Sequence, residues 1–215
     1  MAQRPKAHVR AAILEAAAAE FADVGFARAT LATIARRAGT SIGNLYKYFA
    51  DKDALFAAAI PPALVAKLKR LFRARMRAVG TESDVGRLSA GHPYRVAAAT
   101  LLEFSFSHRH QVLFLFRSAT GTRFASFREE LEDELGRLAL AYARRVHPSF
   151  EVNPVRRRTL ARIYRAYLSA LVSVLRDESS ETSVREASEE LVRYHLGGLR
   201  AFFDSGSSEM TETST

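Results

Sequence analysis

The feature that most constrains the fold of this chain is a pair of short helices joined by a glycine turn within residues 30–55. Thr30 is a good N-cap, and Gly39 follows where a left-handed residue ends a helix at low cost. The apolar positions between them recur at i, i+3, i+4 and i+7, as Leu31, Ile34, Ala35 and Ala38. This spacing predicts a helix over residues 31–38 with one buried face.

The second helix of the pair is expected over residues 42–49, with Ser41 as its N-cap and with Leu45 and Phe49 pointing inward. Its remaining positions are Gly43, Asn44, Tyr46, Lys47 and Tyr48. Core packing explains this set of residues poorly, whereas a helix lying against DNA explains it well. Two helices joined by a short glycine turn form the helix-turn-helix layout, whose second helix enters the major groove.

The positive charge of the chain is concentrated around this motif. The formal net charge is +9, with 32 Lys and Arg against 23 Asp and Glu. Residues 1–79 hold 14 basic and 5 acidic residues, which gives +9, and the 18 basic and 18 acidic residues that remain cancel. A localised basic surplus indicates polyanion binding, although a solvated basic face that binds nothing is the alternative.

The composition limits the other classes of function. The chain has no cysteine, which excludes disulfides and thiolate metal sites, and a lone His-x-His pair at His108 and His110 is a weak metal signal. We therefore expect no metal and no cofactor. Without a signal-peptide core or an apolar stretch of membrane-spanning length, the protein is expected to be cytoplasmic and to bind no membrane. No catalytic motif is recognisable, so we expect no enzyme.

Helical patterns continue through the chain without any strand signal, so the predicted fold class is all-α. A first helix, residues 8–24, should pack across the helix pair. Pro61 and Pro62 should kink or break the connecting helix at Ile60, because proline lacks an amide donor and disfavours helix before it. The expected segments are a disordered arm (residues 1–7), a helix-turn-helix DNA-binding domain (8–55, motif 30–49), a connecting helix (56–79), a loop (80–92), a helical effector-binding and dimerisation domain (93–204) and a disordered tail (205–215).

Two features of the second half allow more than one interpretation. Six of the 14 phenylalanines fall between Phe104 and Phe127, which is typical of a bundle core but also fits an apolar ligand cavity. Gly197 and Gly198 lie inside the last helix, where each costs up to about 1 kcal/mol. A close helix–helix approach, within one chain or between two subunits, or a local bend would explain them.

The motif residues also follow a known family pattern. The first part of this pattern lies in the first helix, at Ile13, Ala17, Phe21 and Gly25. The second part lies in the next helix and the glycine turn, at Thr30, Ile34, Ala35, Ala38 and Gly39. The third part of the pattern covers Ser41, Gly43, Leu45, Tyr46, Tyr48, Phe49, Lys52 and Leu55. This spacing resembles that of the TetR family of bacterial transcriptional regulators. The departures are Ala29, Thr40 and Tyr48, where threonine, valine and histidine are frequent.

The resemblance and the side-chain chemistry together indicate individual DNA contacts. Phosphate contacts are expected from Thr30, Tyr46, Tyr48 and Lys52. Gly43 should let the helix backbone approach the groove. Lys47 suits guanine, Asn44 suits adenine, and Ile42 can meet a thymine methyl group. Thr33 and Ser41 are expected to make weaker contacts.

The resemblance further implies a homodimer joined through the last two helices, a palindromic double-stranded operator and a small, largely apolar effector. The effector pocket is predicted at Leu101, Phe104, His108, Phe114, Phe124, Phe127, Tyr164 and Tyr167. The dimer interface is predicted at Leu168, Leu171, Leu175, Leu191, Tyr194, Gly198 and Phe202. The leading hypothesis is a ligand-responsive repressor. The alternative is a DNA-binding protein whose C-terminal half only dimerises or contacts proteins.

Overall fold

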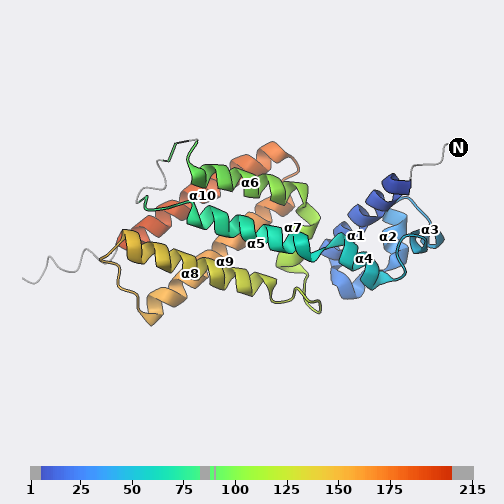
Figure 1. Cartoon of the computed structure of the whole chain (residues 1–215), viewed down its shortest axis with the longest axis horizontal. Coiled ribbons are helices and arrows are strands. Elements are labelled where there is room, and N and C mark those ends of the chain that lie inside the picture. The colour runs from blue at the N-terminus through green and yellow to red at the C-terminus, as the bar shows by residue number, and fades with distance from the viewer. Residues whose placement is uncertain (1–5, 83–87, 90, 205–215) are drawn as a thin grey trace, which may run out of the picture. The chain divides into compact units, whose positions relative to one another are not determined.

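The computed structural model describes residues 6–82, 88–89 and 91–204, and in these residues every regular element is an α-helix (Figure 1). The all-α prediction is confirmed. No helix in these ranges is long and apolar enough to cross a membrane. The tail predicted at residues 205–215, most of the arm at 1–7 and part of the loop at 80–92 lie outside the described residues. Lys6 and Ala7, assigned to the arm, instead begin the first helix.

The helices follow one another in the order α1 (Lys6–Arg28), α2 (Leu31–Arg37), α3 (Ile42–Tyr46), α4 (Lys52–Ala59), α5 (Pro62–Arg77), α6 (Pro93–Ser107), α7 (Arg109–Arg117), α8 (Phe127–Val146), α9 (Pro154–Asp177) and α10 (Glu181–Asp204). They form two compact units. Of the described residues, the first unit contains 6–68 and 108–128, and the second contains those from 69 to 107 and from 129 to 204.

The first unit extends beyond the domain expected from the sequence, because α7 packs against α1 within it. The Ser118 hydroxyl, just after α7, donates to the carbonyl of Ala22 in α1 at 2.9 Å. Phe114 is fully buried, with its ring centroid 6.4 Å from Phe21 and 5.4 Å from Phe56. Residues 108–128 therefore belong with the helix-turn-helix and not with the domain assigned to residues 93–204.

An aromatic cluster forms the centre of the first unit. Five rings approach one another with centroid separations between 4.9 and 6.4 Å: Phe21, Phe26, Phe56, Phe114 and Phe124. Aromatic pairs at such distances add to the free energy gained by burying their area. The phenylalanine density noted in the sequence thus contributes to the core around the helix-turn-helix.

Two changes of backbone direction match the sequence, which predicted the end of the first helix at residue 24 and a kink or break at Ile60. Gly25 interrupts α1 with φ 80° and ψ 163°, a conformation that side chains with a Cβ rarely adopt. Ile60 leaves the helical region at φ −123° and ψ 69°, and α5 begins at Pro62. The connection between α4 and α5 is therefore a break and not a kink within one helix, because Pro61 and Pro62 cannot extend the α4 hydrogen-bond ladder.

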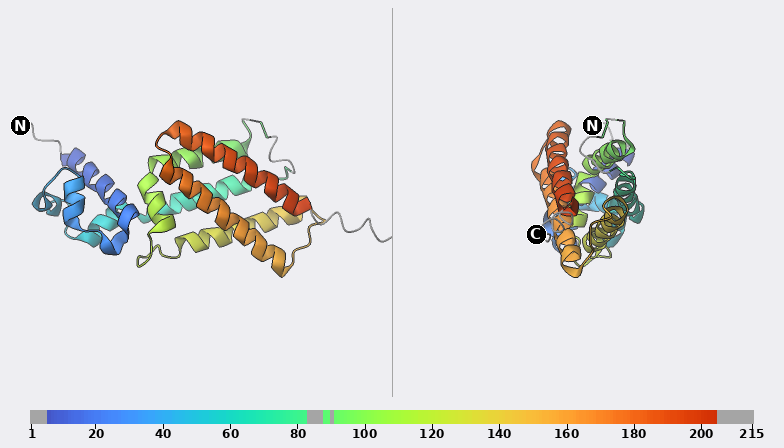
Figure 2. Two further views of the ribbon diagram at one scale, coloured as in Figure 1. Left: turned by 180° about the vertical axis from the view of Figure 1, so that it is seen from behind. Right: turned by 90° about the vertical axis from the view of Figure 1, so that its left-hand side faces the viewer.

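In the second unit, ion pairs join α8 to the helices beside it. Lys69 of α5 contacts Glu130 at 2.6 Å, and Arg165 of α9 contacts Glu132 at 3.0 Å. Arg73 pairs with Glu134, and this contact holds the pKa of that carboxyl below its usual value. Three of the acidic residues in the first two turns of α8 thus form interhelical ion pairs. Helices α9 and α10 pack against each other along this unit (Figure 2).

Candidate functional site

The helix-turn-helix is formed by local hydrogen bonds that its sequence specifies. The Thr30 hydroxyl accepts from the Thr33 amide at 3.1 Å and begins α2. The Ser41 hydroxyl accepts from the Asn44 amide at 3.1 Å and begins α3. Between them Gly39 has φ 65°, as the glycine turn predicted. Helix α3 ends at Tyr46, three residues earlier than expected, so Lys47 and Tyr48 lie in the turn that follows.

The outer surface of α3 is exposed and contains several of the predicted contact residues. Leu45 is fully buried and fixes the helix to the unit, whereas Ile42 and Tyr46 are 44% and 53% exposed. Gly43 is exposed, and a Cβ added to it would meet no protein atom within 4 Å. Lys47 is exposed, and its side chain has no ion pair or hydrogen bond to the described residues. The fold therefore gives no packing reason for the glycine or the lysine at these positions.

Besides Ser41, which caps α3, other predicted polar contacts also take part in internal hydrogen bonds. The Thr33 hydroxyl lies 3.0 Å from the Thr30 hydroxyl. The Asn44 side-chain amide donates to the Thr40 hydroxyl at 2.8 Å and is half-buried. Asn44 can thus offer only its second amide hydrogen and its carbonyl oxygen to a base. Tyr48 is half-buried beside the turn.

Lys52 has a partner that the sequence did not reveal. Its ammonium lies 3.0 Å from the carbonyl oxygen of Phe26, 3.4 Å from that of Ala27 and 3.2 Å from that of Ala29, and 4.5 Å from the centre of the Phe26 ring. A lysine ammonium has three N–H donors. All three have acceptors here, so Lys52 connects the start of α4 to the chain after Gly25 and the expected phosphate contact is not needed to explain it.

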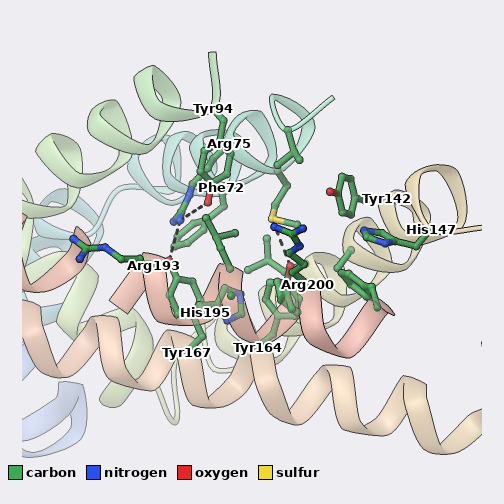
Figure 3. A pocket seen from close by; sticks show the side chains of 18 residues that line it. Phe72, Arg75, Tyr94, Tyr142, His147, Tyr164, Tyr167, Arg193, His195 and Arg200 are labelled. Carbon is green, nitrogen blue, oxygen red and sulfur yellow. Dashed lines mark hydrogen bonds between the residues drawn. The ribbon is translucent and has the colours of Figure 1, made fainter. Parts of the chain in front are cut away.

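The second unit contains a cavity of about 290 Å³ formed by α5, α6, α8, α9 and α10 (Figure 3). Its wall is mainly apolar, with Phe72, Met76, Val79, Leu135, Ala139, Leu196, Leu199 and Phe203. Its polar residues are Arg75, Tyr94, Tyr142, His147, Tyr164, Tyr167, Arg193, His195 and Arg200. An apolar cavity with a few convergent polar groups is the usual form of a small-molecule site.

Arg75 is the most unusual residue of this wall. It is only 7% exposed, and its Nη2 donates to the Tyr94 hydroxyl at 2.8 Å and to the Tyr167 hydroxyl at 2.9 Å. Its Nε is buried without a hydrogen-bond partner. Burial acts to lower the pKa of Arg75 and the two tyrosines act to raise it, with a net upward shift, so the guanidinium is charged.

His195 lies in the same wall as a neutral aromatic ring. It stacks on Tyr167 with a centroid distance of 3.8 Å and an interplanar angle of 7°, and it meets the edge of Tyr164 at 5.2 Å. Burial first, and then the charge of Arg75, lowers the pKa of His195 to about 3. Burial also raises the pKa of Tyr164 and of Tyr167. At neutral pH the charged group among these four residues is Arg75.

Only two of the predicted pocket residues, Tyr164 and Tyr167, line this cavity. The others lie elsewhere for reasons of packing. Phe114 and Phe124 belong to the aromatic cluster of the first unit, and Phe127 packs there against Phe116 at 5.3 Å. His108 precedes α7, also in the first unit, while Leu101 and Phe104 are buried residues of α6.

The cavity residues that the sequence reading missed include Arg75, Tyr94 and His195. A signal for Arg75 existed, because it lies three positions after Phe72 and seven after Leu68, on the apolar stripe of α5. A charged residue at such a position is expected to be buried, which is costly unless the charge is paired or hydrogen-bonded. The described residues contain no group of three or more side chains suited to hold a metal ion.

The predicted dimer residues fall into two groups. Leu168 and Leu175 are buried inside their own unit, so they are corrected to core residues. Phe202 also packs within its unit, against Phe150 and Phe203 at 5.5 and 5.7 Å. Tyr194 is 84% exposed, Gly198 is exposed, and Leu171 and Leu191 are half-buried. A Cβ added at Gly197 or Gly198 would meet nothing within 4 Å, so neither glycine is explained by close packing among the described residues.

Comparisons with known proteins agree with this architecture. A sequence model described as bacterial regulatory proteins, tetR family, matches residues 13–59. The HTH-type transcriptional regulator BetI of Cronobacter sakazakii is 33% identical over 144 residues, which are 60% of this chain and 71% of that protein. The BetI of Serratia proteamaculans is 37% identical over 81 residues, 38% of this chain and 40% of that protein.

The fold has a counterpart among solved structures. A transcriptional regulator of the TerR/AcrR family from Aquifex aeolicus superposes with a TM-score of 0.51 at 19% identity, covering 89% of this chain and 99% of that one. It shares the plan of an N-terminal helix-turn-helix followed by a larger helical part. The motif spacing, the helical fold and the identity to curated regulators agree, and the chain belongs to the TetR family of bacterial transcriptional regulators.

Proposed function

We propose that this regulator is a ligand-responsive repressor that binds a palindromic operator as a dimer and leaves it when a small effector occupies the cavity of the second unit. The observation that carries the DNA-binding part is the outer surface of α3. It presents Gly43 and Tyr46 to solvent on a helix held by the buried Leu45, and the exposed Lys47 follows in the next turn; the fold gives no packing reason for the glycine or the lysine.

The proposed contacts on DNA divide into positioning and reading. Tyr46, Tyr48 and Thr30 bind phosphates, and the Ser41 hydroxyl can donate its own proton to a phosphate while it caps α3. Lys47 reads guanine and Ile42 meets a thymine methyl group, whereas Asn44 contributes the atoms that Thr40 leaves unused. In a dimer the two α3 helices would enter successive major grooves about 34–36 Å apart.

The proposed dimer forms through the outer surfaces of α9 and α10. Tyr194 is an exposed aromatic residue, and exposed glycines at 197 and 198 leave room for a second helix to approach closely. We expect Tyr194→Asp to give a monomer by light scattering, because it places a charge in the interface. Glu189→Lys is the control, since it lies about 140° around α10 from Tyr194. A dimer that survives Tyr194→Asp unchanged would contradict this surface.

Effector control requires that the ligand binds one conformer of the dimer better than the other. The cavity supports this part of the proposal, because it has the size and lining of a small-molecule site. A regulator with no effector, whose second unit only dimerises, remains the competing function. This competing function would be favoured if no ligand that binds in the cavity changes the affinity of the protein for its operator.

The test begins with selection of genomic fragments bound by the purified protein, which identifies the operator. Tyr46→Phe and Lys47→Ala are then compared on a panel of operator variants at fixed salt, since salt changes every affinity. Removing the Tyr46 hydroxyl should weaken all sequences alike, whereas Lys47→Ala should relax the preference at particular bases by about 1–3 kcal/mol. Uniform weakening by Lys47→Ala would contradict its role as a base reader.

A further inference from the structure

We propose that the cavity of the second unit binds a small organic anion, with its carboxylate at Arg75 and its apolar body against the opposite wall. This inference rests on the proposed function, because it names the chemical class of the effector. It follows from a buried cation, from unused hydrogen-bond donors and from the absence of acidic residues among the described cavity residues.

The first step is the charge of Arg75. An ionised group buried in a protein is costly unless a countercharge and hydrogen bonds compensate it. The only hydrogen-bond partners of Arg75 among the described residues are two tyrosine hydroxyls, which are neutral. The rings of Tyr94 and Tyr167 lie 5.2 and 5.8 Å from the guanidinium carbon and offset part of the cost. No carboxylate supplies the rest.

The second step is the set of donors around the guanidinium. Nη2 uses its N–H groups on Tyr94 and Tyr167, while Nε has no partner. Both tyrosines accept from Arg75, so their own hydroxyl protons remain available to donate. Figure 3 shows the Tyr94, Arg75 and Tyr167 side chains converging at one side of the cavity. A carboxylate offers two acceptor oxygens to this group of donors, and hydrogen bonds that involve charged groups are stronger than those between neutral groups.

The third step is the electrostatic character of the rest of the wall. None of the described lining residues is Asp or Glu. Arg193 pairs with Glu190 at 3.1 Å and Arg200 with Asp204 at 3.8 Å, both outside the lining, so Arg75 is the lining arginine that has no carboxylate partner among the described residues. His195 is neutral, because burial and then the charge of Arg75 lower its pKa, so it adds no charge to the wall. A cationic ligand would meet repulsion from Arg75 with no anionic partner. A neutral ligand would leave the buried charge uncompensated.

The fourth step concerns the body of the ligand. The wall contributed by Phe72, Met76, Leu135, Leu199 and Phe203 is apolar. A volume of about 290 Å³ is at the lower end of natural ligand cavities. The anion is therefore small, with a short alkyl chain or a single aromatic ring. The carboxylate at Arg75 is common to both, and the test separates them.

Binding is measured by calorimetry on the full chain with matched probes. Hexanoate and phenylacetate represent the alkyl and aromatic anions, hexanamide and phenylacetamide are their neutral counterparts, and benzyltrimethylammonium is the cation. Charge-assisted hydrogen bonds should make each carboxylate bind roughly tenfold to a hundredfold more tightly than its amide. The tighter of the two carboxylates identifies the body. Binding of neither at about 5 mM, or equal binding of carboxylate and amide, overturns the inference.

Arg75→Met removes the charge, and Arg70→Met is the matched control, because Arg70 is exposed on the same helix and does not line the cavity. Arg75→Met should abolish the preference for carboxylate over amide, and Arg70→Met should keep it. If Arg75→Met does not fold, the double variant Tyr94→Phe, Tyr167→Phe should weaken carboxylate binding more than amide binding and so reduce the preference for carboxylate. A preference that survives removal of Arg75 or of both hydroxyls overturns the inference.

The operator measurement distinguishes this inference from the proposed function. Carboxylate binding that depends on Arg75 but leaves operator affinity unchanged supports the anion site and contradicts ligand control. Release from the operator by the amide or by the cation, without an Arg75-dependent carboxylate preference, supports ligand control and overturns the anion site.

Discussion

Gly43→Ala tests whether α3 lies against DNA, because the change should raise the stability of the protein and lower its affinity for the operator. The substitution adds one methyl group to an exposed helical position, and a Cβ there meets no protein atom within 4 Å. Gly43 does not have a positive φ, so the backbone tolerates alanine. Every cost of the methyl group must therefore come from something outside the protomer.

The magnitude for stability follows from helix propensity. Alanine is favoured over glycine in a helix interior by up to about 1 kcal/mol. Gly43 lies at the second position of a five-residue helix, so about half of that is expected. A gain of this size corresponds to a rise in melting temperature of about 1–2 °C for a chain of this length. Thermal unfolding followed by circular dichroism measures it.

The magnitude for DNA binding comes from crowding at the interface. If the α3 backbone touches the groove, an extra methyl group in a closely packed contact costs about 1–3 kcal/mol, which weakens operator binding about fivefold to 150-fold. Fluorescence anisotropy with a labelled operator at one salt concentration measures this loss. The expected result is a protein that is slightly more stable and binds its operator much more weakly.

Gly39→Ala is the matched control, because Gly39 also has open space around it but has φ 65°. Alanine there costs about 1–2 kcal/mol of stability through backbone strain. Operator binding by Gly43→Ala within twofold of the unchanged protein would refute the close approach of α3 to DNA. Loss of stability in Gly43→Ala would show instead that the glycine serves the fold.

Three further predictions concern other parts of the chain. Lys52→Met should lower stability by about 1–2 kcal/mol in thermal unfolding, because it leaves the carbonyls of residues 26, 27 and 29 without their charged donor; an unchanged melting temperature would contradict this role. The pKa of His195 is about 3 in the folded state against about 6.5 in the unfolded state, so the unfolded state binds the proton first as the pH is lowered. The free energy of unfolding therefore decreases as the pH is lowered from about 6.5 towards 3, by up to about 1.4 kcal/mol per pH unit. His195→Phe keeps the ring and should remove that part of the slope between pH 6.5 and 5, and an identical slope in urea titrations would contradict it. Replacing Pro61 and Pro62 with alanine should change effector-induced release while apo operator binding stays the same, because the helix break then no longer separates α4 from α5; an unaltered ligand response would reject the break as the joint.

The organisation of the helix-turn-helix was predictable from the sequence because its determinants are local. Thr30 and Ser41 each cap a helix through an amide three residues away, and Gly39 supplies the left-handed turn between the two helices. The break before Pro62 has the same origin, since a proline restricts its own residue and the one before it. The concentration of positive charge in residues 1–79 needs no fold at all.

Tertiary structure decided which distant residues meet. Lys52 reaches carbonyls 23 to 26 positions earlier, and Phe114 joins a core that begins with Phe21. The cavity depends most on such contacts, since Arg75 binds hydroxyls 19 and 92 residues away, on α6 and α9. Helix periodicity shows that Arg75 lies on an apolar stripe but not which helices cover that stripe. The helix proposed to read DNA could thus be located from sequence, whereas the proposed ligand cavity could not, because one is built within a few turns and the other from five helices.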